Sequence, residues 1–255
     1  MRTHVKRNPG APPQFFAAEA AGLQWLSVSG GARCATVLDV DDTCLTLEYV
    51  ESASPGAEAA RVLGRRLAVT HDAGAPTFGA PPDGWHGPGY FGPLQQPLPM
   101  SYAEHLSWGA FYAGERLEPM LERARPQLDH HTADNIEKVM KRCGTGEFDD
   151  DDAPARIHGD LWSGNVMWTG AGAVLIDPAA HGGHRETDLA MLHLFGCPHL
   201  QAVMDGYREV HALAAGWRSR IALHQLYPLL AHVVLFGGGY RSQVARAART
   251  TLEIS

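Results

Sequence analysis

The sequence is poor in cysteine and contains no cysteine pair spaced for a metal or a disulfide framework. Its cysteines are Cys34, Cys44, Cys143 and Cys197, far apart among 255 residues and without a C-x-x-C motif. Isolated thiols of this kind are typical of a reducing compartment. We therefore expect a cytoplasmic protein whose cysteines are buried, and no zinc-ribbon site.

A basic surplus and a long apolar run are also missing. The formal net charge is -7 and no basic stripe is present, which gives no electrostatic basis for binding nucleic acid. The longest apolar run, residues 226–236, contains Pro228 and His232 and is too short to cross a bilayer. The basic N-terminus continues into Asn-Pro-Gly at residues 8–10 rather than an apolar segment, so no signal peptide is expected.

What is present is a change from strand-like to helical patterning. Strand-like segments occur at residues 3–6, 35–40 and 45–50. A helical stretch begins at Phe15, and a Ser-Pro-Gly-containing linker at residues 52–56 precedes a mainly helical region with one embedded β segment. The pattern predicts an α+β protein with a small β-containing part at residues 1–52 and a larger helical part at residues 53–255.

Three short motifs resemble functional sites, but we expect them to be structural. LDVDDT at residues 38–43 matches the nucleophile motif of haloacid dehalogenases, yet a second strand follows at once, which favours a hairpin turn. GPGYFG at residues 87–92 has the G-x-G-x-x-G spacing, but Pro88 removes a backbone donor, which favours a loop lining some other pocket. The run Asp149–Asp152 is expected to be a solvated loop.

One stretch carries chemistry that a hairpin alone does not require. His158, Asp160 and Asn165 reproduce the H-x-D-x-x-x-x-N spacing of a kinase catalytic loop, and Asp177 ends the next apolar strand, where a kinase places a metal-binding aspartate. An alcohol that attacks a γ-phosphate needs a carboxylate to accept its proton, and Asp160 fits that role. Mg²⁺ needs oxygen ligands, which Asn165 and Asp177 supply if a hairpin brings them together.

These residues stand within longer motifs that identify a family. HGDLWSGN, IDPA, GHRETDLAML and LFGGGY together resemble the fructosamine kinase (ketosamine kinase) family, and the resemblance runs from about residue 5 to about residue 245. It implies a protein-kinase-like two-lobe fold and ATP- and Mg²⁺-dependent phosphorylation of the 3-hydroxyl of ketosamines, which are glycated amines. The acceptors implied are small ketosamines or glycated lysines on proteins, in a deglycation or repair role.

The resemblance also assigns the nucleotide side of the site. It implies that Lys6 grips the α- and β-phosphates and that Glu19 on the following helix is its ion-pair partner. It further implies that a hinge of Glu48, Tyr49 and Val50 binds adenine through its backbone. Asp160 is then the catalytic base, with Asn165 and Asp177 as Mg²⁺ ligands.

On the acceptor side the residues leave alternatives open. Trp162 either stacks on the acceptor sugar or belongs to the core, and His184 and Glu186 are candidates for acceptor contact. His158 is expected to pack and to hold the loop by hydrogen bonds. Asp188, at the start of a helix, is expected to be a cap or an anchor for the catalytic loop.

The sequence departs from the family pattern at its N-terminus. In the family fold two strands and a glycine-rich loop precede the phosphate-binding lysine, which here is residue 6. GPGYFG lies in the second lobe and cannot replace that loop. We therefore expect a shortened form or a variant of reduced activity, with an unpaired sheet edge and an uncovered apolar face.

Two other functions fit the same residues. The first is a kinase-like binding protein without phosphotransfer, which the missing glycine-rich loop favours. The second is a related small-molecule kinase that acts on an aminoglycoside or on an amino alcohol such as choline. The sequence does not predict the oligomeric state.

Overall fold

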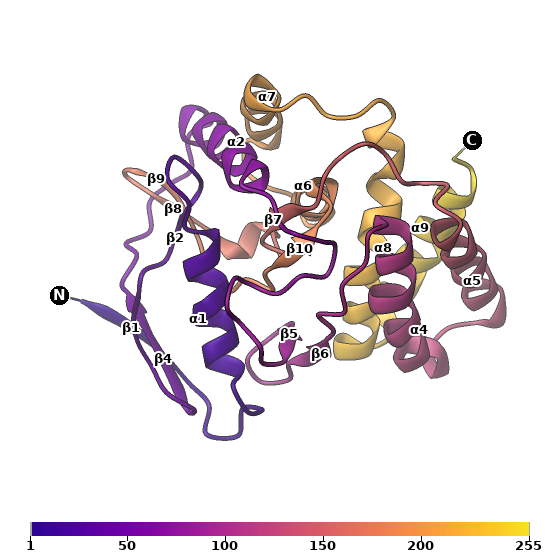
Figure 1. The fold of residues 1–255 in the computed structure, drawn as a ribbon, viewed down its shortest axis with the longest axis horizontal. Helices are drawn as coiled ribbons and strands as arrows, with labels where there is room; N and C mark the ends of the chain where they lie inside the picture. The colour runs from indigo at the N-terminus through magenta and orange to yellow at the C-terminus, as the bar shows by residue number, and fades with distance from the viewer. Residues whose placement is uncertain (1, 255) are drawn as a thin grey trace.

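The structure, a computed structural model, describes residues 2–254 and has an α+β architecture (Figure 1). The helices are α1 (Phe15–Leu26), α2 (Ala57–Asp72), α3 (Trp108–Phe111), α4 (Glu118–Ala124), α5 (His130–Gly144), α6 (Arg185–Leu194), α7 (Leu200–Val210), α8 (Trp217–Phe236) and α9 (Arg241–Leu252). The strands are β1 (Thr3–Arg7), β2 (Arg33–Cys34), β3 (Val37–Val40), β4 (Cys44–Glu48), β5 (Gly89–Phe91), β6 (Leu98–Met100), β7 (Ala155–Ile157), β8 (Val166–Thr169), β9 (Gly172–Leu175) and β10 (His181–Gly183).

The N-terminal sheet has the order β1–β4–β3 and is antiparallel throughout. The turn between β3 and β4 is closed by Asp41, whose carboxylate accepts hydrogen bonds from the backbone of Thr43 and Cys44. This is the side-chain-to-backbone bonding by which aspartate favours turns. The prediction that LDVDDT is a hairpin turn is confirmed.

One edge of this sheet has no neighbouring strand. Within residues 2–254, β1 pairs with β4 alone, so the outer edge of β1 is open. Val5, Leu38, Val40 and Tyr49 are large apolar side chains of this region that are between 38% and 48% exposed. The open edge and the exposed apolar surface agree with the expectation from sequence.

The two parts of the chain share a second sheet, of order β2–β9–β8. The short strand β2 runs parallel to β9, with Arg33 opposite Val174 and Cys34 opposite Leu175. A buried apolar core likewise joins α1 and β4 to α2 and α7, and a second core lies among α4, α5, α8 and α9. The division at residue 52 remains a prediction, because the first core extends across it.

The helices form where apolar residues recur at helical spacing. In α2 the buried Ala60, Leu63 and Leu67 lie on one face, and Asp129 caps α5 by accepting the Thr132 N–H. Helices α3 and α4 are joined by a π-helical turn at Tyr112–Leu117. None of the helices between residues 2 and 254 combines the length and apolar composition that a bilayer span requires.

Candidate active site

A cavity of about 220 Å³ lies between the N-terminal sheet and the helical part of the chain. Its polar lining is Lys6, Glu19, Asp160, Asn165 and Asp177, which are five of the residues proposed from the sequence. Its remaining walls are mostly apolar and aromatic, and include Phe15, Tyr90, Phe91, Trp162, His232, Leu235 and Phe236. An apolar cavity with a few convergent polar groups is the usual form of a small-molecule site.

A β-hairpin brings Asn165 and Asp177 together. Strands β8 and β9 pair from Val166 opposite Leu175 onward, and the Ile176 N–H donates to the carbonyl of Asn165 at 3.1 Å. The residue after this pair, Asp177, has a φ of 56°, a left-handed conformation that aspartate tolerates better than most residues. The expectation that a hairpin unites these residues is confirmed.

Gly159 allows the catalytic loop to approach the strand that leads out of the hairpin. Its φ is 81°, and a Cβ atom at this position would lie 2.2 Å from the carbonyl oxygen of Ala179. Only glycine fits both the backbone angle and the space. The residue that precedes Asp160 is therefore fixed by packing as well as by conformation.

The Asn165 side chain is oriented by acceptors on both sides of the site. Its Nδ2 donates to the Asp160 carbonyl at 2.8 Å and lies 3.3 Å from Asp160 Oδ2 and 3.4 Å from the Asp177 carbonyl. The amide oxygen Oδ1 is thereby turned away from these carbonyls. Among residues 2–254, Oδ1 accepts no hydrogen bond.

Lys6 connects the sheet, helix α1 and the hairpin. Its Nζ lies 2.7 Å from both carboxylate oxygens of Glu19 and 3.0 Å from Asp177 Oδ1. Burial opposes the charge of Lys6, but the two carboxylates outweigh it and raise the pKa of Lys6 above its usual value. The lysine is held charged at the edge of the cavity, and the predicted pairing of Lys6 with Glu19 is present.

Asp160 is a partly buried carboxylate with a strongly altered affinity for protons. Burial, and secondly the charge of Asp177, raise the pKa of Asp160 to about 7, against the partial opposing effect of the hydrogen bond from Asn165. A carboxylate with this pKa accepts a proton near neutral pH far more readily than an exposed aspartate does. The position is chemically suited to a general base.

Behind Asp160 the loop is anchored by Asp188 and His158. Asp188 is fully buried, and its two oxygens accept the backbone N–H groups of His158 and Gly159 at 2.7 Å and 2.9 Å. The His158 ring donates from Nε2 to the Ile176 carbonyl and accepts the Asp160 N–H at Nδ1. Both residues hold the loop as expected from the sequence.

The oxygen atoms available as ligands at the hairpin suit a magnesium ion. Asn165 Oδ1 and Asp177 Oδ2 face the site without a hydrogen-bond donor in the described part of the chain, and the Asp177 side chain is 44% exposed. Unpartnered carboxylate and amide oxygens are the ligands that Mg²⁺ prefers. The residues therefore fit the ion that the fold implies.

The predicted hinge residues do not line the cavity. The N–H groups of Glu48 and Tyr49 donate to the carbonyls of Thr36 and Arg2, whereas the Val50 N–H makes no hydrogen bond within residues 2–254. The Glu48 carboxylate binds Thr36 at 3.0 Å and so holds the end of the sheet. Of the three hinge residues, Val50 has the backbone donor that is free for a ligand.

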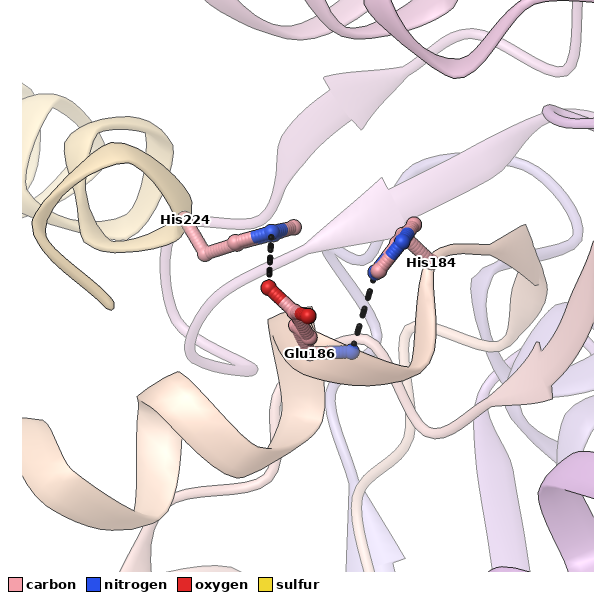
Figure 2. Close-up of side chains that lie close together, drawn as sticks. All are labelled: His184, Glu186 and His224. Carbon is pink, nitrogen blue, oxygen red and sulfur yellow. Dashed lines mark hydrogen bonds and ion pairs between the residues drawn. The ribbon is translucent and has the colours of Figure 1, made fainter. Parts of the chain in front are cut away.

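His184 and Glu186, predicted to contact the acceptor, are not brought to the cavity either. They are 2% and 3% exposed and form a buried cluster with His224 (Figure 2). His184 accepts the Glu186 N–H at Nδ1 and caps α6, while Glu186 Oε2 lies 3.4 Å from His224 Nε2. Arg220 also binds Glu186 through two nitrogens, so the cluster already contains the positive charge that a metal ion would supply.

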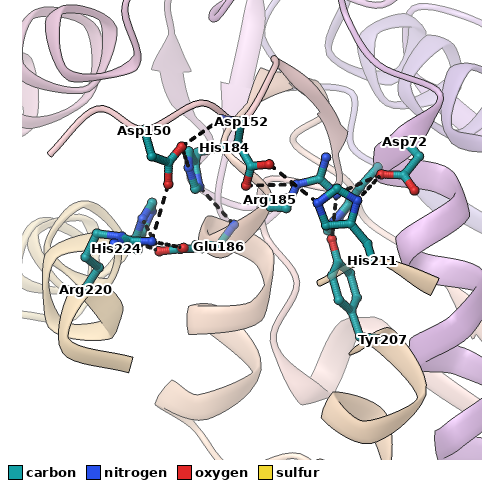
Figure 3. Close-up of polar contacts among 11 residues, drawn as sticks. Asp72, Asp150, Asp152, His184, Arg185, Glu186, Tyr207, His211, Arg220 and His224 are labelled. Atoms are coloured by element: carbon teal, nitrogen blue, oxygen red, sulfur yellow. Dashed lines mark hydrogen bonds and ion pairs between the residues drawn. The ribbon is translucent and has the colours of Figure 1, made fainter. Parts of the chain in front are cut away.

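The acidic run at residues 149–152 is a loop in which Asp149 and Asp151 are exposed, as predicted, while Asp150 and Asp152 are partly buried in ion pairs. Asp149 accepts hydrogen bonds from Ser107 and Gly109, and Asp150 pairs with His184 and Arg220 (Figure 3). Asp152 pairs with Arg185 at 3.2 Å. The prediction of a solvated segment does not hold for Asp150 and Asp152, because the charged partners of these two aspartates come from segments distant in sequence.

The aromatic wall of the cavity was only partly predicted. Tyr90 and Phe91 confirm that GPGYFG lines a pocket, and Trp162, 39% exposed, lies at the cavity and in edge contact with Phe195. His232 was missed. Its Nδ1 donates to the Pro228 carbonyl at 2.7 Å, one turn earlier in α8, and a histidine inside an apolar run was the signal.

Known proteins resemble this chain in sequence and in fold. The sequence profile of fructosamine kinases matches residues 1–254. A probable ketoamine kinase from Synechocystis is 33% identical over 98% of this chain and 83% of its own length. A crystal structure assigned as a fructosamine-3-kinase, from Thermobifida fusca, superposes with a TM-score of 0.90 at 48% identity, covering 99% of this chain and 86% of the other.

The wider fold is that of small-molecule kinases. An aminoglycoside phosphotransferase crystallised with AMP-PNP and hygromycin B superposes with a TM-score of 0.61 at 14% identity, covering 99% of this chain and 91% of the other. At that identity the likeness concerns the fold alone. The protein-kinase-like α+β fold expected from the sequence is confirmed.

Proposed function

The chain belongs to the fructosamine kinase family and is a phosphotransferase with an alcohol acceptor, and we propose that it phosphorylates the 3-hydroxyl of ketosamines with ATP. The observation that carries this proposal is the convergence of Asp160, Asn165, Asp177 and Lys6 on one cavity. A deglycation or repair role follows if free ketosamines or glycated lysines are the acceptors.

In the proposed reaction Asp160 removes the proton of the attacking hydroxyl. Asp160 Oδ2 faces Asn165, which leaves Oδ1 to accept a hydrogen bond from the acceptor. As the acceptor oxygen bonds to the γ-phosphorus, the bond from that phosphorus to the β–γ bridging oxygen breaks. ADP leaves, and the hydroxyl proton passes to Asp160. A pKa of about 7 allows Asp160 to take this proton near neutral pH.

Lys6, Asn165 and Asp177 bind the nucleotide in this proposal. Mg²⁺, when bound by Asn165 and Asp177, would neutralise charge on the phosphates. Lys6 is held by Glu19 at a position from which its ammonium can reach phosphate oxygens, and the Val50 N–H is free for the adenine edge. The aromatic wall, including Trp162, excludes water and is available to contact the acceptor sugar.

The experiment is an acceptor comparison with product analysis. ADP release is measured with ATP and Mg²⁺ on a ribulosamine, a fructosamine, an aminoglycoside and choline, using wild type and Asp160→Asn. We expect ADP release with the ketosamines and a strong reduction of that release in Asp160→Asn. In the product, NMR should show coupling between phosphorus and the carbon at position 3. Preference for the aminoglycoside or choline would replace this proposal with a related kinase function.

A binding protein without phosphotransfer is the alternative that the sequence left open. Calorimetry separates the two. Ketosamine binding without measurable Mg·ATP binding and without ADP release would support a binding protein. Micromolar Mg·ATP affinity together with turnover would exclude it.

A further inference from the structure

A continuous line of buried side chains runs from the start of α6 to the backbone that precedes Asp160. Arg185 Nη1 lies 3.0 Å from the Tyr207 hydroxyl, and that hydroxyl lies 2.8 Å from His71 Nδ1. His71 Nε2 lies 3.1 Å from Asp188 Oδ2. The fully buried Asp188 then accepts the His158 and Gly159 N–H groups described above.

The donors and acceptors in this line can have only one arrangement. Asp188 in its ionised form can only accept, so His71 must donate to it from Nε2. A neutral imidazole with its proton on Nε2 has a lone pair on Nδ1, so the Tyr207 hydroxyl donates to His71. Arginine only donates, and Arg185 therefore binds the remaining lone pair of Tyr207. Each hydrogen bond in the line is therefore donated in the direction of Asp188.

The charge states agree with this arrangement. Burial lowers the pKa of His71, which keeps the ring neutral despite its contact with Asp188. Burial opposes the charge of Asp188, but the hydrogen bonds from His71 and from the His158 backbone lower the pKa of Asp188 below its usual value. One oxygen of Asp188, Oδ2, receives both His71 and the His158 N–H, so His71 directs the same atom that holds the loop.

The sequence builds the close helix contact that this line needs. Helices α2 and α7 cross so tightly that a Cβ on Gly64 would lie 1.9 Å from the Val203 carbonyl, and one on Gly206 would lie 2.0 Å from the Arg61 carbonyl. The two glycines let the helices approach, and the His71 and Tyr207 rings meet with their centroids 5.5 Å apart. The end of the line in solvent is Asp72, which binds Arg185 (Figure 3).

We propose that His71 is a positioning residue for phosphoryl transfer: its Nε2–H fixes the Asp188 carboxylate, and Tyr207 and Arg185 fix the His71 tautomer. His71 does not line the cavity and acts only through Asp188 and the His158–Gly159 backbone, which set where Asp160 stands. The effect on turnover rests on the proposed function. The effect on the loop backbone does not.

Three variants separate positioning from general stability. His71→Leu removes both hydrogen bonds, whereas His71→Gln retains an N–H that can reach Asp188 and an oxygen that can accept from Tyr207. Leu63→Ala damages the same buried face of α2 without touching the line. We expect kcat to fall about 10–100-fold in His71→Leu with little change in KM for ATP, to recover within about threefold in His71→Gln, and to stay near wild type in Leu63→Ala.

Amide hydrogen exchange tests the same inference without turnover. Exchange of the Gly159 N–H should accelerate at least about tenfold in His71→Leu, but not in His71→Gln or in Leu63→Ala under conditions where all remain folded. The inference is overturned if Gly159 exchange in His71→Leu matches wild type, or if Leu63→Ala loses as much kcat as His71→Leu. It is also overturned if His71→Gln is as impaired as His71→Leu. If no variant and no wild type turns over a ketosamine, the proposed function fails while the exchange result still decides the role of His71.

Discussion

Two buried polar clusters of similar composition differ in how completely their charges are compensated. Around Asp160, the oxygens Asn165 Oδ1 and Asp177 Oδ2 have no donor within residues 2–254, and the pKa of Asp160 is raised to about 7. Around Glu186, Arg220 and His224 meet the carboxylate and the pKa of Glu186 is lowered to about 2, even though burial opposes its charge. The first cluster opens into a cavity, and the second is sealed.

The difference indicates which cluster binds a ligand and which cluster stabilises the packing of the helices. A protein that leaves oxygens unpaired and a carboxylate poorly solvated loses stability, and such features persist at sites where a ligand completes them. A cluster whose carboxylate is already paired with an arginine stabilises the contacts between its helices and needs no ligand to compensate its charge. Both clusters contain acidic and basic residues, so composition does not distinguish them.

The largest expected effect is the loss of activity in Asp160→Asn. Removing the base should lower kcat for ketosamine phosphorylation by about 10²–10⁴-fold, because the amide cannot accept the hydroxyl proton. KM for ATP should change little, and the unfolding midpoint should not fall. Steady-state ADP release and a thermal melt measure both. Unchanged kcat would remove the first cluster from catalysis.

The opposite pattern is expected in the second cluster. Arg220→Met leaves Glu186 and Asp150 without their shared cation, which should lower the free energy of unfolding by about 3 kcal/mol. Denaturant titration measures this, with Arg125→Met as control, because the exposed Arg125–Glu137 pair should contribute less than about 1 kcal/mol. The kcat of Arg220→Met, calculated per folded molecule, should match wild type. A lower kcat per folded molecule would contradict the purely stabilising role of the second cluster.

The apolar helices and the catalytic hairpin could be predicted because their signals are local. Apolar residues at helical spacing determine α2, and the offsets between His158, Asp160 and Asn165 follow from one loop and one hairpin. The family resemblance also predicted the pairing of Lys6 with Glu19, which are thirteen positions apart. These features need little information about distant segments.

What could not be predicted depends on contacts between distant segments. The sequence does not show that Asp150 meets Arg220, or that His184 and Glu186 face inward rather than toward the cavity. Nor does it indicate that His71 and Asp188, separated by 117 positions, share a hydrogen bond. Side-chain environment in three dimensions decides such roles, and residue type alone is compatible with either outcome.

A smaller effect concerns stability and pH at Asp160. Its folded-state pKa of about 7 lies above the unfolded value, so the neutral form favours folding. Wild type should therefore lose stability as pH rises through 7, whereas Asp160→Asn should not. The variant should gain on the order of 2 kcal/mol over wild type at pH 8 and little at pH 4. Urea titrations at both pH values without nucleotide measure the difference, and a constant difference would contradict the raised pKa.

The smallest expected effect is on the acceptor. Trp162→Ala should raise KM for a ketosamine about tenfold by removing an aromatic surface at the cavity, while KM for ATP stays within about twofold. Trp168→Phe is a control on the neighbouring strand, since Trp168 does not line the cavity. Equal KM values for the acceptor in Trp162→Ala and wild type would show that this tryptophan is packing rather than binding surface.

The pH dependence of ketosamine phosphorylation tests the central claim most directly, because it reports the protonation state of Asp160 during turnover. In wild type, kcat/KM for the acceptor should rise with a single deprotonation near pH 7, as the raised pKa of Asp160 predicts. The residual activity of Asp160→Asn should show no such rise. A wild-type profile that is flat from pH 5 to 9, or the same rise in Asp160→Asn, would contradict the account.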